Sequence, residues 1–136
     1  MKNKTIWLGL IAATIGLGLA ACQSGNNGAQ SGDGAAKTIE AYLQARVKSD
    51  ETQMINLSCA DWEAGARTEA ESFKSMNAKL DGVTCQTVSG DANAAVVTCQ
   101  GKIVTAYNGD TRDTPLTGRE YSLVHQDGEW RMCGYK

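Results

Sequence analysis

Five cysteines and one histidine are the side chains with the most reactive chemistry in this chain of 136 residues. Four of the cysteines, Cys59, Cys85, Cys99 and Cys133, follow residue 50, and an even number in an exported chain predicts two disulfides. Zinc binding is the alternative, but no two cysteines have the close spacing of a zinc site and His125 is the only histidine. We therefore expect no metal and no cofactor. A catalytic thiol is not favoured either, because the sequence offers little that could act as its base.

The fifth cysteine, Cys22, ends a segment with the three parts of an export signal. Two lysines lie near the start, an apolar run covers residues 6–19, and Leu19-Ala20-Ala21 precedes the cysteine. The segment resembles the bacterial lipoprotein signal peptides, whose lipobox reads Leu-small-small-Cys. The resemblance implies a lipid on the Cys22 sulfur, cleavage before Cys22, and acylation of the new amino group, for example by palmitate. A permanent anchor, or an ordinary cleaved signal with an incidental cysteine, is the alternative, but the run is short for a spanning helix, which needs about 20 apolar residues.

The lipid anchor predicts where the mature protein lies and what it contacts. It would be held outside the cytoplasm on the cell membrane, or on an outer membrane or periplasmic face if the cell has one. Two or three acyl chains would hold the protein stably on the membrane, since each buried methylene contributes roughly 0.8 kcal/mol. The whole chain has a net charge of −2, and removal of the signal takes away two lysines and no acid. Nucleic acid is therefore not expected as a partner, because it requires a positive surface.

Composition divides the chain into three parts. Residues 1–21 are the predicted signal peptide, and residues 22–34 are rich in Gly, Ser, Asn and Gln, which predicts a flexible tether that carries the lipid. Residues 35–136 are expected to form one domain.

Helical periodicity fills the first half of that domain. Asp33 is a candidate cap for a helix beginning near Ala35, and Asp50 is a candidate cap for a short second helix. A third helix is expected to begin at Ser58. Its apolar stripe comprises Trp62, Ala66, Ala70, Phe73, Met76 and Leu80.

After Asp81-Gly82 the apolar period changes to two, which predicts four strands. We place them at residues 83–88, 94–107, 116–126 and 129–135, with a polar loop over residues 108–115 and a bulge or bend at Gly101. Asp127-Gly128 is a two-residue hairpin signal. It predicts a register with His125 opposite Trp130, and an inward face that bears Tyr121, Leu123, His125, Trp130 and Met132.

The turn around residues 91–93 would place Cys85 opposite Cys99, which favours that disulfide together with Cys59–Cys133. Cys133 falls on the outer face in this register, which counts against its reaching Cys59. The pairing of Cys59 with Cys85 and of Cys99 with Cys133 therefore stays open.

The helices followed by strands predict an α+β fold, with N-terminal helices packed against a curved four-stranded antiparallel sheet. Residues 35–136 resemble the nuclear transport factor 2-like, cystatin-like group, through the first helix TIEAYLQARVKSD, the long strand VVTCQGKIVTAY and the closing LVHQDGEWRMCGYK. The resemblance implies a cone with a pocket between sheet and helices. Some relatives are isomerases or dehydratases and others are binding domains. No catalytic motif of theirs can be matched in this chain, so no catalytic residue is carried over.

Three functions follow from these expectations. The first is a lipid-anchored, non-catalytic domain that binds a small apolar ligand or an envelope protein. Its candidate pocket residues are Tyr42, Trp62, Tyr107, His125 and Trp130. The second is a small enzyme of the isomerase or dehydratase type, with His125 as acid–base group. The third is an assembly subunit that binds a partner through the outer sheet face. The outward apolar residues of that face are Val88, Val96, Val104 and Val124.

Overall fold

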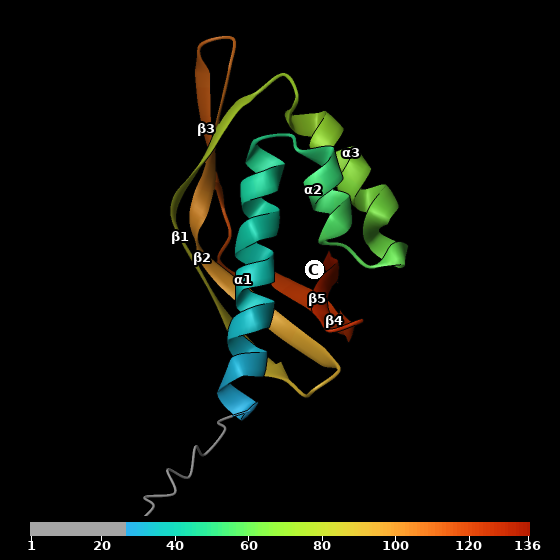
Figure 1. The fold of residues 1–136 in the computed structure, drawn as a ribbon. Helices are drawn as coiled ribbons and strands as arrows, with labels where there is room; N and C mark the ends of the chain where they lie inside the picture. Colours follow the sequence, from blue (N-terminus) through green and yellow to red (C-terminus); the bar gives the residue numbers. More distant parts are fainter. Residues whose placement is uncertain (1–26) are drawn as a thin grey trace, which may run out of the picture.

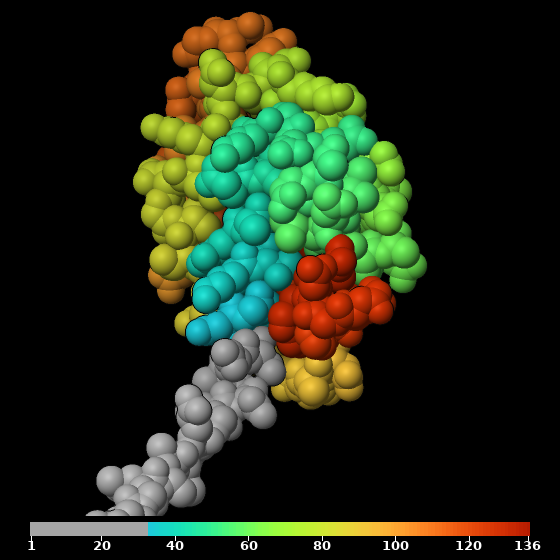
Figure 2. Space-filling view, in the orientation of Figure 1, coloured from blue at the N-terminus to red at the C-terminus, as the bar shows by residue number. Residues whose placement is uncertain are grey.

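Three α-helices lie on one side of a curved five-stranded antiparallel sheet (Figure 1). The computed structural model describes residues 27–136, so the predicted signal peptide, Cys22 and the start of the tether lie outside the described residues. The helical part consists of α1 (Asn27–Val47), α2 (Glu51–Asn56), a 3₁₀ turn η1 (Ala60–Trp62) and α3 (Glu63–Phe73). In the space-filling view, the helices cover much of the sheet (Figure 2). The predicted α+β architecture is confirmed.

The sheet consists of β1 (Asn77–Gly90), β2 (Ala94–Tyr107), β3 (Asp110–Pro115), β4 (Glu120–Gln126) and β5 (Glu129–Tyr135). The long strand β2 organises it. One edge of β2 pairs with β1 along most of its length, and the other edge pairs with β4 in its first half and with β3 in its second half. The partner changes at Gly101, which has a φ of +87° and lies opposite an irregularity in β1. The predicted bend at Gly101 is therefore confirmed.

The core lies between α1 and the inward face of the sheet. Tyr42, Ile39 and Leu43 are fully buried on the helix side. The sheet contributes the buried residues Val97, Cys99, Ile103, Tyr121, Leu123, Trp130 and Met132. The predicted register of the last hairpin is confirmed, with His125 opposite Trp130.

Helix α1 begins earlier than predicted. It starts at Asn27, so the stretch 27–34 that we assigned to the tether is helical and Asp33 is not its N-cap. Low intrinsic propensity does not stop a helix that is already nucleated and packed further along, since elongation costs far less than nucleation. By contrast, Asp50 caps α2 as expected, and its carboxylate accepts the N–H of Gln53 at 3.0 Å.

The third helix is shorter than predicted at both ends. Ser58 does not cap it, because its hydroxyl donates to the carbonyl of Met54 at 2.8 Å. At the other end α3 stops at Phe73, and Leu80 lies in β1. Residues 77–81 pair with residues 102–106 of β2. This ladder satisfies the backbone groups of the segment and outweighs its helical period, since every buried N–H and C=O needs a partner.

Strand β3 replaces the loop that we predicted over residues 108–115. Asn108 and Gly109 both have positive φ and connect β2 to β3 in a two-residue turn, in which Tyr107 lies opposite Asp110. Asn-Gly is a hairpin signal of the same kind as Asp-Gly. The sequence analysis missed this strand because its residues are polar and show no apolar alternation. They are polar because the β2–β3 hairpin extends past the end of α1, where it has little apolar surface to contact (Figure 1).

The favoured disulfide pairing is the one that the structure contains. Cys85 is bonded to Cys99, directly opposite on β2, and Cys59 is bonded to Cys133. The objection to the second bond fails because Cys59 approaches from the edge of the sheet and not from its face. Residues 57–59 run beside β5, where Met132 donates to the Leu57 carbonyl and accepts from Cys59, each at 2.8 Å.

Candidate functional site

A partly open cavity of about 460 Å³ lies between the carboxyl end of α1 and the β2–β3 hairpin. We call it the distal cavity, because it lies at the opposite end of α1 from Asn27. The helices contribute Arg46, Phe73 and Met76, and the hairpin contributes Ile103, Thr105, Tyr107, Asp110, Arg112 and Thr114. Its size falls within the range of small-molecule sites, roughly 300–1,000 Å³.

The six hairpin residues of the cavity are three directly opposed pairs. Ile103 faces Thr114, Thr105 faces Arg112, and Tyr107 faces Asp110. Alternate residues of a strand share one face, so all six side chains belong to the same side of the hairpin. The wall therefore changes from apolar near the core to polar near the tip.

Arg46 connects this cavity to a buried polar cluster. Only 12% of its side chain is exposed, and its Nη2 lies 3.4 Å from Oε1 of Glu69, itself almost buried. Glu69 also accepts from the hydroxyl of Tyr42 at 2.8 Å and from that of Tyr135 at 2.6 Å. The Tyr42 oxygen accepts the indole N–H of Trp62 at 3.0 Å. We call these five residues the tyrosine network.

The network holds its phenols in the protonated state. Burial, followed by the negative charge of Glu69, raises the pKa of Tyr42 far above the usual range of a phenol. Burial and the hydrogen bond to Glu69 also raise the pKa of Tyr135. Neither Tyr42, Tyr135 nor Glu69 lines the distal cavity. The cluster therefore joins the helices to the sheet.

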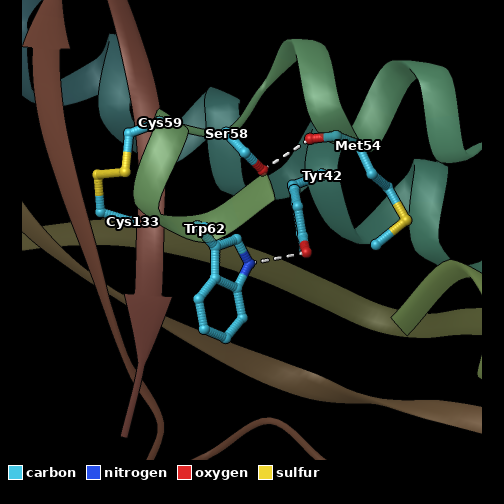
Figure 3. The surroundings of a disulfide bond; sticks show 6 residues. All are labelled: Tyr42, Met54, Ser58, Cys59, Trp62 and Cys133. Carbon is cyan, nitrogen blue, oxygen red and sulfur yellow. Dashed lines mark hydrogen bonds between the residues drawn. A yellow bond between two sulfur atoms is a disulfide. The ribbon is translucent and has the colours of Figure 1, made fainter. Parts of the chain in front are cut away.

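Figure 3 shows how Trp62 enters the network beside the Cys59–Cys133 disulfide. The indole points toward Tyr42, and its ring packs edge-on against Tyr135 with centroids 5.7 Å apart. Because Trp62 follows Cys59 by three residues, the disulfide that attaches residues 57–59 to β5 also holds the indole in place.

The structure does not bring the five predicted pocket residues together. Tyr42 and Trp62 meet inside the network, and Tyr107 is 56% exposed on the distal cavity. His125 and Trp130 pack against each other with ring centroids 4.9 Å apart. They belong to the β4–β5 hairpin, and neither lines the distal cavity. His125 is exposed in spite of its inward register, because it lies at the end of β4.

Three residues at or beside the candidate site were missed by the sequence analysis: Arg46, Glu69 and Arg112. The first two carried a signal. Arg46 follows Tyr42 by one helical turn, and Glu69 lies among Ala66, Ala70 and Phe73 on the buried stripe of α3. A charged residue on an apolar face usually has a buried partner. Arg112 carried no signal, because its strand was not predicted.

The outer sheet face offers limited apolar surface. Val88 is 51% exposed beside a register shift of β1, whereas Val96, Val104 and Val124 are half-buried. Among the described residues, no group of three or more His, Cys, Asp or Glu side chains is placed to hold a metal ion. No helix in that part of the chain is long and apolar enough to cross a membrane.

Comparisons with known proteins concern the fold. No protein-family model and no curated protein matches the chain. Among solved structures, a proposed dehydratase of the NTF2-like family from Streptomyces avermitilis matches with a TM-score of 0.57 and 14% identity, over 79% of this chain and 94% of that one. An NTF2-like protein with a cystatin-like fold from Novosphingobium aromaticivorans matches with a TM-score of 0.55 and 11% identity, over 76% of this chain and 77% of that one. A proposed ketosteroid isomerase from Shewanella frigidimarina matches with a TM-score of 0.52 and 13% identity, over 75% of this chain and 92% of that one.

These likenesses agree with the helix order and the curved antiparallel sheet. Nuclear transport factor 2 (NTF2)-like folds carry enzymes and proteins of other kinds, so activity has to be argued from the site. The described part of this chain has an NTF2-like, cystatin-like α+β fold.

Proposed function

We propose that the protein is an exported lipoprotein whose NTF2-like domain binds a small ligand in the distal cavity without transforming it. The observation that carries the proposal is the cavity itself. Its wall combines apolar and aromatic side chains with a few polar groups, which is the usual composition of a ligand site. The wall itself carries the titratable side chains Tyr107, Asp110 and Arg112. The phenols and the carboxylate of the tyrosine network, by contrast, are hydrogen-bonded to one another.

The export part of the proposal rests on the signal segment and on the cysteines. Both disulfides are formed between the four cysteines after residue 50, as an oxidising compartment allows. Helix α1 has 21 residues, so its ends are roughly 30 Å apart at 1.5 Å per residue. A lipid on Cys22 would be attached near the Asn27 end, and the distal cavity would open toward the far side of the domain, away from the bilayer.

The catalytic alternative with His125 receives no support from the geometry. His125 is exposed and packs on Trp130, and it does not line the cavity that could hold a substrate. A general base has to lie within hydrogen-bond reach of the proton that it removes.

Two measurements test the proposal. Intact mass of protein extracted from membranes should show a chain that begins at Cys22 and carries acyl groups, and Cys22→Ala should release a folded protein from the membrane. An unmodified mature chain would refute the anchor.

For the ligand site, a small-molecule fragment library should shift backbone NMR signals of residues 103–107 and 110–114. Met76→Trp, which fills the cavity, should abolish these shifts, whereas Val88→Trp on exposed surface should preserve them. Fragment shifts that persist unchanged in Met76→Trp would refute the distal cavity as the site.

A further inference from the structure

Arg46 has more hydrogen-bond donors than the protein supplies with acceptors. Its Nη2 is paired with Glu69, but Nε and Nη1 are buried and have no partner among the described residues. Glu69 contacts only Nη2 of the guanidinium, and its two oxygens also accept from Tyr42 and Tyr135. A buried donor without an acceptor is costly, and more so on a charged group. An oxygen-bearing group next to Arg46 would satisfy these donors.

Arg112 adds a second positive charge to the same cavity. Its side chain is exposed on β3, and among the described residues it forms no ion pair. The neighbouring acid Asp113 points to the opposite face of the hairpin, where Lys102 binds it at 2.6 Å. Asp110 is the one acid on the cavity wall. The cavity wall thus carries two guanidinium groups and one carboxylate, while the carboxylate of Glu69 pairs with Arg46 from outside the wall.

The rest of the cavity wall favours a ligand with an apolar body. Phe73, Met76, Ile103 and Tyr107 supply aromatic and aliphatic surface. The ring of Phe73 also holds the Arg46 guanidinium, whose central carbon lies 5.0 Å from the ring centroid. Stacking fixes the plane of a guanidinium, and a fixed plane favours the bidentate geometry that carboxylates accept.

We propose that the distal cavity binds a small organic acid, with the carboxylate on Arg46 and Arg112 and the apolar body against Phe73 and Met76. This inference rests on the proposed function and names its ligand class. Nε and Nη1 are covered in the ligand-free structure. The ligand reaches them when the Arg46 guanidinium, which lines the cavity, turns toward it.

Three probes with one body and different head groups test the charge preference: 4-phenylbutyrate, its neutral amide, and 4-phenylbutylammonium. Each is titrated into the mature domain, and the dissociation constant and the shifted backbone signals are measured by NMR. The acid should bind about tenfold more tightly than the amide, the scale of one hydrogen bond to a charged group, and the ammonium should bind most weakly. The shifts should map to residues 103–107 and 110–114.

Matched variants separate the two arginines from general charge. Arg46→Gln should weaken binding of the acid about tenfold, Arg112→Gln should weaken it several-fold, and binding of the amide should change little. Lys102→Gln removes the same charge from the opposite face of the same hairpin and should leave the acid's affinity unaltered. If Arg46→Gln does not fold, the affinity of Arg112→Gln for the acid and the relative affinities of the three probes still test the proposal.

The outcomes distinguish this inference from the function on which it rests. Equal binding of the three probes in the cavity, or a preference for the ammonium through Asp110, overturns the anion site and leaves the binding function standing. Binding of the acid elsewhere on the domain overturns the anion site as well. If none of the probes binds and fragments also fail to shift the cavity, both proposals fall.

Discussion

The two disulfides should contribute unequally to stability, because they close loops of very different length. Cys59–Cys133 spans 74 residues, whereas Cys85–Cys99 spans 14. If a disulfide acts mainly by restricting the unfolded chain, the longer loop contributes about 4.4 kcal/mol and the shorter about 3.0 kcal/mol at 25 °C. The comparison is well matched, since each bond has one buried cysteine, Cys59 or Cys99.

The perturbation is a pair of double variants, Cys59→Ala with Cys133→Ala, and Cys85→Ala with Cys99→Ala. Alanine avoids the buried hydroxyl that serine would introduce. The free energy of unfolding is measured by urea denaturation, followed by far-ultraviolet circular dichroism. The first variant should lose about 1.4 kcal/mol more than the second, a tenfold difference in the folding equilibrium.

Two backbone hydrogen bonds of the folded state allow this expectation to be tested without a large change in native structure. The backbone hydrogen bonds between Met132 and residues 57–59 remain available after the Cys59–Cys133 bond is removed, so the folded state can keep its geometry. The loss would then come from the unfolded state. An equal loss in both variants, or a greater loss for the shorter loop, would refute the chain-entropy reasoning and indicate that local strain or packing dominates.

Three further predictions concern the folded state. Gly101→Ala should destabilise by more than about 3 kcal/mol, beyond the cost of positive φ alone, because the new Cβ would lie 2.5 Å from the Gly82 carbonyl oxygen. Gly118→Ala, with nearly the same φ and open space, is its control, and equal losses on urea denaturation would contradict the steric account. Tyr42→Phe should cost about 1–3 kcal/mol, since it leaves the indole N–H of Trp62 and an oxygen of Glu69 without partners, and a smaller loss on thermal unfolding would argue against the network. Because the pKa of Tyr42 is raised in the folded protein, its unfolded phenol ionises first. The contribution of Tyr42 to stability should therefore be constant below about pH 10 and fall above it by up to about 1.4 kcal/mol per pH unit. Denaturation between pH 8 and 11 measures this slope, and Tyr42→Phe should reduce it.

Local patterns in the sequence predicted much of the sheet and its covalent links. Alternation and turn residues placed β2 at Ala94–Tyr107 and β5 at Glu129–Tyr135, and the Asp-Gly turn placed His125 opposite Trp130. The same reasoning placed Cys85 opposite Cys99. These features depend on residues within about a dozen positions of one another, where period and turn geometry leave few alternatives.

Long-range pairing was decided only by the folded chain. Residues 77–81 continue a helical stripe in sequence, yet they become strand because β2 offers them backbone partners. Cys59 reaches Cys133 because residues 57–59 run along the edge of β5. A residue's own pattern does not specify which distant backbone will satisfy its hydrogen bonds.

The candidate site belongs to this second class. Arg46 and Glu69 lie on different helices, and Arg112 lies on a strand that forms only against β2. Sequence could mark the first two as charges on apolar faces, but it could not show that they meet, or that the hairpin closes a cavity over Arg46. Local motifs were enough to predict export and paired cysteines. The candidate ligand site, by contrast, arises where three separate segments converge, because burial and charge pairing are properties of the packed chain.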